Sequence, residues 1–356
     1  MAGIKLREEL AEALRGGLVI PAHPLALTDD GRLDRASQYA LTRYYIAAGA
    51  GGVAVGVHNT QLGIHYNGMY EDVLRIAVEA YEDAKPKRPF LMLAGVLLED
   101  EGRAVGEAQL AADLGYDMAV PVPLGAVKDE GALLSLIQRI SEILPIFAFY
   151  PQRAIGGPAL SRAFWAKLAE EMPNLYAVKI APFNRYETIY VVRAIASIRD
   201  DVAFYTGNDD NIIIDLLTPI PVGGKYKWIV GGLLGQWSVW TLFAVKLLDK
   251  IKEVRRKIAA GAPIPSDLLR LNAEYTDANS AIFDAAHGFK GLYAGINEVL
   301  RRQGLVKSRR TLDGVDLSPG QLEEIERVLR EYPHLHEEDD AFVKEHLGEF
   351  LSGYTP

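Results

Sequence analysis

Short runs of apolar residues recur along the chain, separated by stretches with helical spacing. Each run has five to seven residues, and consecutive runs begin 25 to 38 residues apart. Nearly continuous apolar runs of this length are typical of parallel strands buried on both faces. The eight runs cover residues 18–23, 52–57, 90–96, 117–122, 145–150, 175–180, 202–207 and 227–231.

The stretches between the runs carry helix punctuation. Residues 160–172 follow a possible N-cap at Ser161 and end before Pro173, and Gly49 follows the stretch 34–48. Eight strand–helix units predict an α/β fold, a (β/α)8 TIM barrel over residues 15–250. A doubly wound open sheet is the competing architecture. It usually has fewer units, and no glycine-rich nucleotide fingerprint follows the first run.

Beyond residue 250 the strand pattern stops and only helical spacing remains. We therefore predict a barrel over residues 1–250 and a C-terminal helical extension over residues 251–356. The expected helices cover residues 249–260, 267–281, 292–303, 321–331 and 341–351.

Composition and charge narrow the function classes. Lys and Arg total 38 against 47 Asp and Glu, so the net charge is −9, and the absence of a basic run argues against a nucleic-acid partner. The absence of cysteine excludes disulfides and thiolate chemistry. Residues 228–245 are uncharged but rich in glycine, so we expect no membrane span. The N-terminal segment lacks an apolar core, and a cytoplasmic location is the default expectation.

A lysine interrupts the sixth apolar run, at position 179. In such barrels the active site lies at the carboxyl ends of the strands. Burial disfavours the charged ammonium, so it lowers the pKa of the lysine and leaves a neutral amine that can attack a carbonyl. The alternative is a lysine whose ammonium reaches solvent or a carboxylate.

The fifth run ends at Tyr150, on the strand next to the one that carries Lys179. A hydroxyl at this position can shuttle protons beside the lysine amine. The alternative is a core tyrosine with one hydrogen bond.

These residues give the chain a resemblance to a known superfamily. The segments are VIPAHPLALTDDGRLD, AGAGGVAVGVHNTQ, PIFAFYPQ, NLYAVKIA, TGNDD and IVGGLLG, between about Gly17 and Gln303. They resemble the dihydrodipicolinate synthase/N-acetylneuraminate lyase superfamily of class I, Schiff-base aldolases and dehydratases. The resemblance implies that Lys179 forms an imine with a 2-keto acid and that Tyr150 is the proton-relay tyrosine.

The loop after the second run departs from the superfamily pattern. The usual loop reads Gly-Thr-Thr-Gly-Glu or Gly-Ser-Thr-Gly-Glu and holds the carboxylate of the keto acid, whereas this chain has Gly56, Val57, His58, Asn59 and Thr60. Backbone N–H groups can still bind the carboxylate, with side-chain donors from His58 or Asn59. His58 is an acid–base candidate or, alternatively, an oriented loop residue without chemistry.

Further departures lie after the fourth and fifth runs. Residues 121–124 read Pro-Val-Pro-Leu where dihydrodipicolinate synthases usually carry a tyrosine pair, which argues against that enzyme itself. The usual arginine five places after the strand-five tyrosine is missing. Arg153 is a candidate partner for the substrate carboxylate or, equally, an ordinary surface arginine.

The seventh run leads into Gly207, Asp209 and Asp210, where the sialic-acid lyase branch carries Gly-x-Asp-Glu. By this resemblance Asp209 and Asp210 accept hydrogen bonds from a hydroxylated substrate, with Gln236 near strand eight assisting. The alternative is that one of the two aspartates caps the helix expected over residues 211–217.

Together these features predict a class I lyase or aldolase that acts on a pyruvate-type 2-keto acid through an imine. A dehydratase of a keto-deoxy sugar acid uses the same imine, and an inactive barrel that binds a small acid is a third possibility. The mechanism requires no cofactor and no metal, because the iminium itself accepts electrons. The resemblance further implies a homo-oligomer, either a dimer or a tetramer.

Overall fold

The computed structural model of the chain describes residues 4–124 and 129–354. Each of the eight apolar runs overlaps a strand, and helices separate these strands along the chain. The fold is a (β/α)8 barrel with additional C-terminal helices, which confirms the predicted class. The eight strands are β1 (Val19–Pro21), β2 (Gly52–Val55), β3 (Leu91–Leu97), β4 (Met118–Val122), β5 (Ile146–Tyr150), β6 (Leu175–Ile180), β7 (Ala203–Thr206) and β10 (Ile229–Leu234).

The chain divides into two compact units. The first contains the chain up to Leu18 and Pro89–Leu233, and the second contains Val19–Arg88 and Leu234–Pro356. Our sequence boundary at residue 250 lies inside helix α10 (Thr241–Ala259), so it would cut a continuous element. The C-terminal helices therefore share a compact unit with the first two strands.

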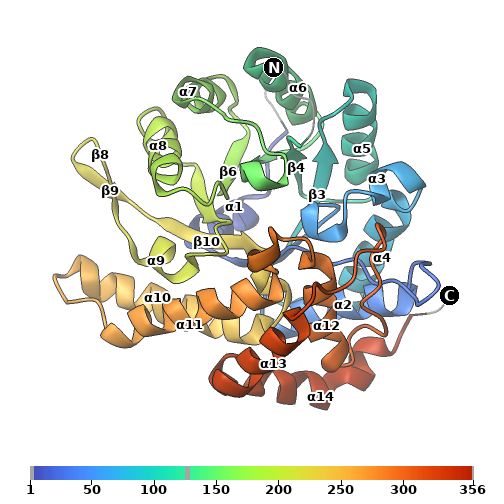
Figure 1. Cartoon of the computed structure of the whole chain (residues 1–356). Helices are drawn as coiled ribbons and strands as arrows, with labels where there is room; N and C mark the ends of the chain where they lie inside the picture. Colours follow the sequence, from blue (N-terminus) through green and yellow to red (C-terminus); the bar gives the residue numbers. More distant parts are fainter. Residues whose placement is uncertain (1–3, 125–128, 355–356) are drawn as a thin grey trace. The chain divides into compact units, whose positions relative to one another are not determined.

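Six parallel strands form the first unit, in the order β10-β7-β6-β5-β4-β3. Figure 1 shows helices α5 to α8 on one side of these strands. Every residue of β3, β4 and β5 is buried, which explains why these strands appear in the sequence as apolar runs. The helices of this unit are α1 (Glu8–Gly16), α5 (Glu101–Asp113), α6 (Glu130–Ser141), α7 (Arg162–Glu171), α8 (Arg185–Ala196) and α9 (Ile212–Leu217).

Two elements of the first unit were not predicted. An antiparallel hairpin joins β8 (Ile220–Val222) to β9 (Lys225–Lys227) through Gly223 and Gly224, both at positive φ. Glycine adopts this conformation without steric cost, as a two-residue hairpin turn requires. The other element is helix α1, which buries Leu10, Ala11 and Leu14.

The second unit begins with β1 and β2, which lie side by side. The Gly51 amide donates to the Val19 carbonyl at 2.9 Å, and the His23 amide donates to the Ala54 carbonyl at 2.8 Å. The helices of this unit are α2 (Arg35–Ala48), α3 (Ile64–Asn67), α4 (Tyr70–Ala84), α10, α11 (Ser266–Ile282), α12 (Leu292–Arg302), α13 (Gln321–Glu331) and α14 (Glu337–Leu351).

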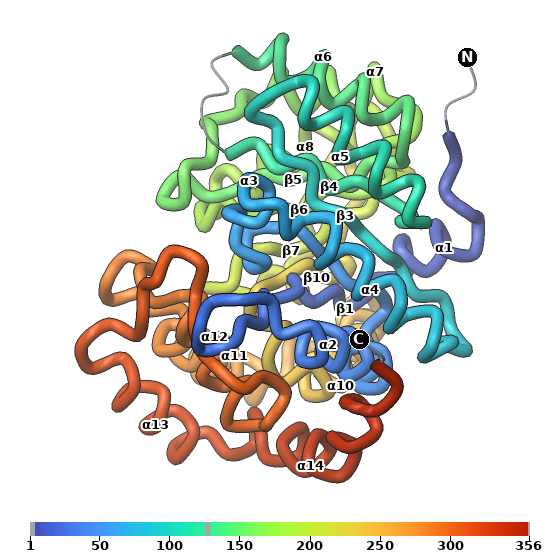
Figure 2. The backbone as a smooth tube through the Cα atoms, turned by 90° about the vertical axis from the view of Figure 1, so that its right-hand side faces the viewer, coloured from blue at the N-terminus to red at the C-terminus, as the bar shows by residue number. Residues whose placement is uncertain are grey.

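The last helix, α14, is anchored by a buried carboxylate. Both oxygens of Asp339 accept hydrogen bonds from the Tyr44 hydroxyl of α2, and the Leu242 amide of α10 donates to the same carboxylate. Figure 2 shows α2, α10 and α14 close together. Burial raises the pKa of Asp339 to about 6. The C-terminal extension is therefore an integral part of its unit.

No helix within the described ranges is both long and apolar enough to cross a membrane. The uncharged stretch 228–245 is divided among β10, a short 3-10 helix (Gln236–Ser238) and the beginning of α10.

Candidate active site

Lys179 is the fifth residue of β6 and is buried, with 8% of its surface exposed. Burial lowers its pKa from 10.5 to about 8, against an opposing effect from the negative charge of Asp209. With a pKa near 8, about one amine in ten is neutral at pH 7. The structure thus gives Lys179 the electrostatic property that a nucleophilic amine needs.

Strand register identifies the neighbours of Lys179. Its Cα is paired with Phe149 on β5 and with Tyr205 on β7. Paired residues on adjacent parallel strands point to the same face of the sheet. The Lys179 ammonium lies 4.6 Å from the centre of the Phe149 ring, so an aromatic ring occupies the place beside the amine.

Tyr150 points to the opposite face from Lys179, which corrects its predicted role as a proton relay. It is paired with Ile180, and its ring packs 5.3 Å from that of Trp165 on α7. Its hydroxyl donates to Glu187 on α8 at 2.7 Å and lies 3.0 Å from the Tyr190 hydroxyl. The alternative that the sequence left open, a core tyrosine with one hydrogen bond, is closer to this geometry, in which the hydroxyl has two partners.

The surroundings of Tyr150 keep its hydroxyl protonated. Burial raises the pKa of Tyr150 well above its ordinary value, and the hydrogen bonds to Tyr190 and Glu187 raise it further. The predicted carboxylate partner Arg153 also belongs to this group, since its guanidinium donates to Glu187 at 2.8 Å. Because the Arg153 guanidinium is bonded to Glu187, this arginine belongs to a hydrogen-bond network within the protein.

Gly207 makes room for the lysine side chain. A Cβ atom at Gly207 would lie 2.6 Å from Cε of Lys179 and 2.7 Å from Cβ of Ala181. Distances this short are steric clashes, so only glycine leaves Lys179 in its observed position. Asp209, two residues further on, is buried and acts on Lys179 through its charge. The structure therefore brings Lys179, Gly207 and Asp209 together, as the sequence predicted.

Neither Asp209 nor Asp210 caps the next helix. The N-cap position of α9 is Asn211, which makes no side-chain capping bond. Burial raises the pKa of Asp210, and the nearby positive charge of Arg185 partly opposes this effect. Because Asn211 occupies the N-cap position, the prediction that one of the two aspartates caps this helix is wrong.

A polar network that the sequence did not reveal links the loops after β6 and β7. The Asn208 side chain accepts a hydrogen bond from the Phe183 amide at 2.9 Å and donates to Asp215 at 2.9 Å. The Thr206 hydroxyl donates to Asp215 at 2.7 Å. Phe183 has a φ of 54°, a left-handed conformation that bulky residues rarely adopt. This network holds a strained loop in place three residues after Ile180.

In the second unit, hydrogen-bond donors of the loop after β2 are bonded to other groups of the protein. The Gly56 amide donates to the Thr60 hydroxyl at 3.0 Å, and that hydroxyl donates to the His23 carbonyl at 2.7 Å. Gly56 and Thr60 therefore shape the loop, and their predicted role as direct donors to a substrate carboxylate is not supported. Val57 is buried.

The remaining predicted loop residues differ in their partners. Nε2 of His58 lies 3.2 Å from the Tyr293 hydroxyl. Asn59 is 6% exposed, and its side-chain nitrogen has no acceptor among the residues that the structure describes. A buried amide without a partner is costly, so Asn59 is the binding candidate that this loop retains. The Gln236 side-chain oxygen accepts a hydrogen bond from Asn279 at 2.9 Å, which ties it to helix α11.

The strand order defines the class as a (β/α)8 barrel, and a buried lysine with a lowered pKa lies near the carboxyl end of β6. No family model matches the chain, and no curated protein matches it. Solved structures do match, and they show that the chain has the fold of the dihydrodipicolinate synthase/N-acetylneuraminate lyase superfamily.

Three of these structures illustrate the similarity. Dihydrodipicolinate synthase from Cyanidioschyzon merolae, with lysine bound, is 19% identical with a TM-score of 0.70, over 88% of this chain and 97% of that one. YagE from E. coli K12, in complex with pyruvate, has the same identity, coverage and TM-score. N-acetylneuraminate lyase from Fusobacterium nucleatum, complexed with pyruvate, is 16% identical with a TM-score of 0.70, over 90% of this chain and 98% of that one.

Proposed function

We propose that this protein is a class I, Schiff-base lyase that acts on a pyruvate-type 2-keto acid through Lys179. The observation that carries the proposal is the buried amine near the carboxyl end of β6, whose pKa is lowered to about 8. Barrels of this kind place their active sites at the carboxyl ends of the strands. Three of the solved structures with a similar fold contain pyruvate, which supports the class of substrate.

The proposed reaction begins when the neutral amine of Lys179 adds to the C2 carbonyl of the keto acid. A C–N bond forms, and the resulting hydroxyl group leaves as water to give a protonated imine. When the C3–C4 bond breaks, its electron pair forms a C2=C3 double bond, and the π electrons of the C=N bond move to nitrogen to give an enamine. The C4 hydroxyl loses its proton to a base, and an aldehyde departs. Protonation at C3 and addition of water at C2 then release the shorter keto acid and restore the amine.

We assign to Asp209 the role of stabilising the positive charge that develops in this reaction. Its carboxylate favours the positively charged form of Lys179, so it also favours the protonated imine. It is the candidate base for the C4 hydroxyl in place of Tyr150, which faces α7 and α8. The role of Asn59 as a donor to the keto acid carboxylate remains a prediction from the sequence of its loop.

The specific observation of Phe149 beside Lys179 favours a second candidate function. A ring without a hydroxyl occupies the position in register with the lysine, so no tyrosine on β5 serves the amine. A barrel that forms an imine or binds a small acid without turnover fits this observation. Turnover assays with keto acids and aldehydes of different polarity separate this candidate from a lyase.

Reductive trapping tests the proposal. The protein is incubated with pyruvate and borohydride, and peptide mass analysis locates the modification. We expect a single adduct on Lys179, its loss in Lys179→Arg, and its retention in the matched control Lys167→Arg, which alters an exposed lysine of α7. Failure of every keto acid to label the wild-type protein would contradict the imine mechanism. An adduct that persists in Lys179→Arg would contradict the assignment of the lysine.

A further inference from the structure

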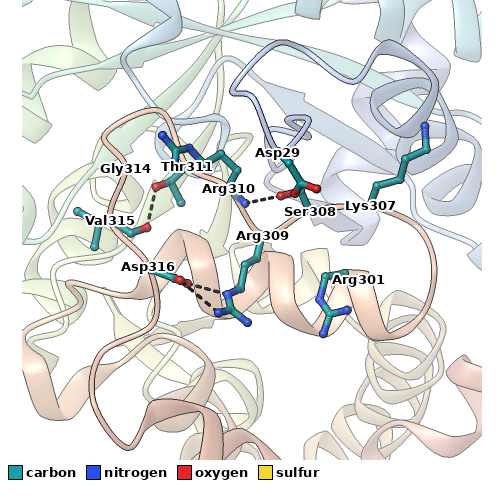
Figure 3. A pocket seen from close by; sticks show the side chains of 10 residues that line it. All are labelled: Asp29, Arg301, Lys307, Ser308, Arg309, Arg310, Thr311, Gly314, Val315 and Asp316. Atoms are coloured by element: carbon teal, nitrogen blue, oxygen red, sulfur yellow. Dashed lines mark hydrogen bonds and ion pairs between the residues drawn. The ribbon is translucent and has the colours of Figure 1, made fainter.

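Two polar regions of the structure contain charged side chains that the proposed reaction does not use. The first is a cavity of about 500 Å³ in the second unit, shown in Figure 3. Charged side chains of its lining are paired within the protein, as Arg309 is with Asp316 at 2.6 Å and Lys307 with Asp34 at 3.3 Å. The second region lies in the first unit, around a buried carboxylate of helix α9, and it reaches the backbone beside the proposed nucleophile.

The carboxylate of this second region belongs to Asp215, which is 2% exposed. It accepts hydrogen bonds from the Thr206 hydroxyl at 2.7 Å and from the Asn208 side-chain nitrogen at 2.9 Å. It also pairs with the Arg185 guanidinium. A buried carboxylate that is held by a cation and two further donors keeps a fixed orientation. Asp215 therefore fixes the two residues that flank Gly207.

Asn208 has no exposed surface, and it uses both ends of its side-chain amide. The oxygen accepts a hydrogen bond from the Phe183 amide at 2.9 Å, and the nitrogen also donates to the Thr188 hydroxyl at 3.3 Å. The backbone amide of Asn208 donates to the Thr206 hydroxyl at 3.1 Å. Asn208 thus ties the loop after β7 to the loop after β6 and to helix α8.

The backbone between Thr206 and Asn208 packs against the lysine. The Gly207 amide donates to the Ile180 carbonyl at 2.8 Å. A Cβ atom at Gly207 would lie 2.6 Å from Cε of Lys179 and 3.0 Å from its Cγ, so the glycine covers the stem of the lysine. Thr206 is in register with Ile180, so its side chain lies on the opposite face of the sheet from Lys179. The network therefore acts on the lysine through the backbone.

This packing matters because it keeps water from the lysine. Burial is the largest cause of the lowered pKa of Lys179, and burial depends on the atoms that cover the side chain. A looser loop would admit water and stabilise the ammonium form. We propose that Thr206, Asn208 and Asp215 are positioning residues, whose bonds hold the loop after β7 against the lysine and exclude water from its amine. This inference rests on the proposed function and adds the residues that prepare its nucleophile.

Substitution of Thr206 tests this role, because valine has nearly the same shape without the hydroxyl. Thr206→Val removes the bond to Asp215 and leaves the Asn208 backbone amide without its acceptor. We expect the pKa of Lys179 to rise from about 8 by about one unit, so that the neutral amine at pH 7 falls about tenfold. Thr206→Ser keeps the hydroxyl and should retain the wild-type pKa.

Competitive labelling with acetic anhydride measures this pKa without any keto acid. The full-length protein is labelled at a series of pH values, and peptide mass analysis gives the extent of reaction at Lys179. Urea denaturation measures the free energy of unfolding of each variant. Borohydride trapping with pyruvate at pH 7 completes the set, and the initial rate of imine formation should fall about tenfold in Thr206→Val.

Two control variants separate positioning from loss of stability. Thr218→Val removes a hydroxyl at the other end of α9, which donates to the Ile214 carbonyl, and should leave the pKa of Lys179 unchanged. Tyr150→Phe removes a buried hydroxyl that donates to Glu187 and should lower stability without changing this pKa.

A milder variant keeps the test decisive if Thr206→Val does not fold. Thr188→Val cuts the longest of the bonds to Asn208, at 3.3 Å. It should therefore raise the pKa of Lys179 in the same direction but by a smaller amount.

The results distinguish this inference from the proposed function. A pKa of Lys179 that stays near 8 or falls in folded Thr206→Val, while the free energy of unfolding drops, would show a purely structural network and overturn the inference. An equal shift in Thr206→Ser would also contradict it, since the hydroxyl remains there. Failure of the wild-type protein to form an imine with any keto acid would overturn the proposed function alone, because acetic anhydride labels the amine without one.

Discussion

The two faces of the β5–β6 strand pair show how one sheet supports two different environments. On one face, the Lys179 amine lies against the Phe149 ring, and the negative charge of Asp209 raises the pKa of the amine. On the other face, Tyr150 and Glu187 form a hydrogen-bonded network with α8. The first face leaves a cation underpaired, whereas the second satisfies its polar groups. The reactivity that we propose lies on the face whose polar group is incompletely satisfied.

Replacing the lysine should break this comparison most strongly. Lys179→Met removes the nucleophile and should lower the turnover of a keto acid substrate by about 10⁴-fold or more. The substrate could then bind only noncovalently. Steady-state rates with the best substrate of a keto acid panel provide the measurement. Residual turnover within tenfold of the wild type would show that no imine is needed.

Removing the neighbouring carboxylate should have the next largest effect. Asp209→Asn deletes the charge that favours the protonated amine, so we expect the pKa of Lys179 to fall below 8. Loss of a positioned acid–base group should also slow C–C cleavage by about a hundredfold. The pH dependence of imine formation reports the first effect and turnover the second. An unchanged pH profile would show that Asp209 does not act on the lysine.

The wild-type pH profile should show the same amine directly. With a pKa of about 8, the neutral fraction of Lys179 rises from about 1% at pH 6 to about 50% at pH 8. The initial rate of imine formation should therefore rise about fiftyfold over this range and level off above pH 9. Incubation for short times, followed by a borohydride quench at one common pH, isolates this step. A midpoint near 10.5 would mean that the lysine is not desolvated.

Tyr150→Phe should leave the reactive face nearly unchanged. The substitution removes the hydroxyl that donates to Glu187 and should lower the free energy of unfolding by about 1–2 kcal/mol. The rate of imine formation should stay within about twofold of the wild type. Urea denaturation and borohydride trapping measure the two properties. A folded variant without imine formation would restore Tyr150 to the reaction.

The positions of the eight barrel strands could be predicted because strands buried on both faces have nearly continuous apolar sequences. Lys179 was found for the same reason, since a lysine stands out within an apolar run. The direction of Tyr150 could not be found in this way. It depends on the register between β5 and β6, in which Tyr150 is paired with Ile180 and not with Lys179. Register is a property of two strands, so one strand's sequence does not reveal it.

The long-range bonds of the loops were also invisible in the sequence. Thr60 was predicted to belong to the substrate-binding loop, but its hydroxyl bridges the Gly56 amide and the His23 carbonyl, and His23 is 37 residues away along the chain. Helix α1 was missed although Leu10, Ala11 and Leu14 have helical spacing, and the β8–β9 hairpin was missed because its strands have only three residues each. Short elements and distant partners carry little local signal.

The N-terminal segment makes contacts that a shortened form of this protein would lose. The Tyr205 hydroxyl donates to the Leu14 carbonyl at 2.7 Å and accepts from the Leu18 amide at 3.1 Å. Tyr205 is in register with Lys179, so these contacts extend from the first helix to the strand beside the amine. Deleting the first eighteen residues would leave a buried phenol without partners in the wall of the barrel. A truncation at this end would therefore destabilise the barrel in the same way as a substitution of a buried barrel residue.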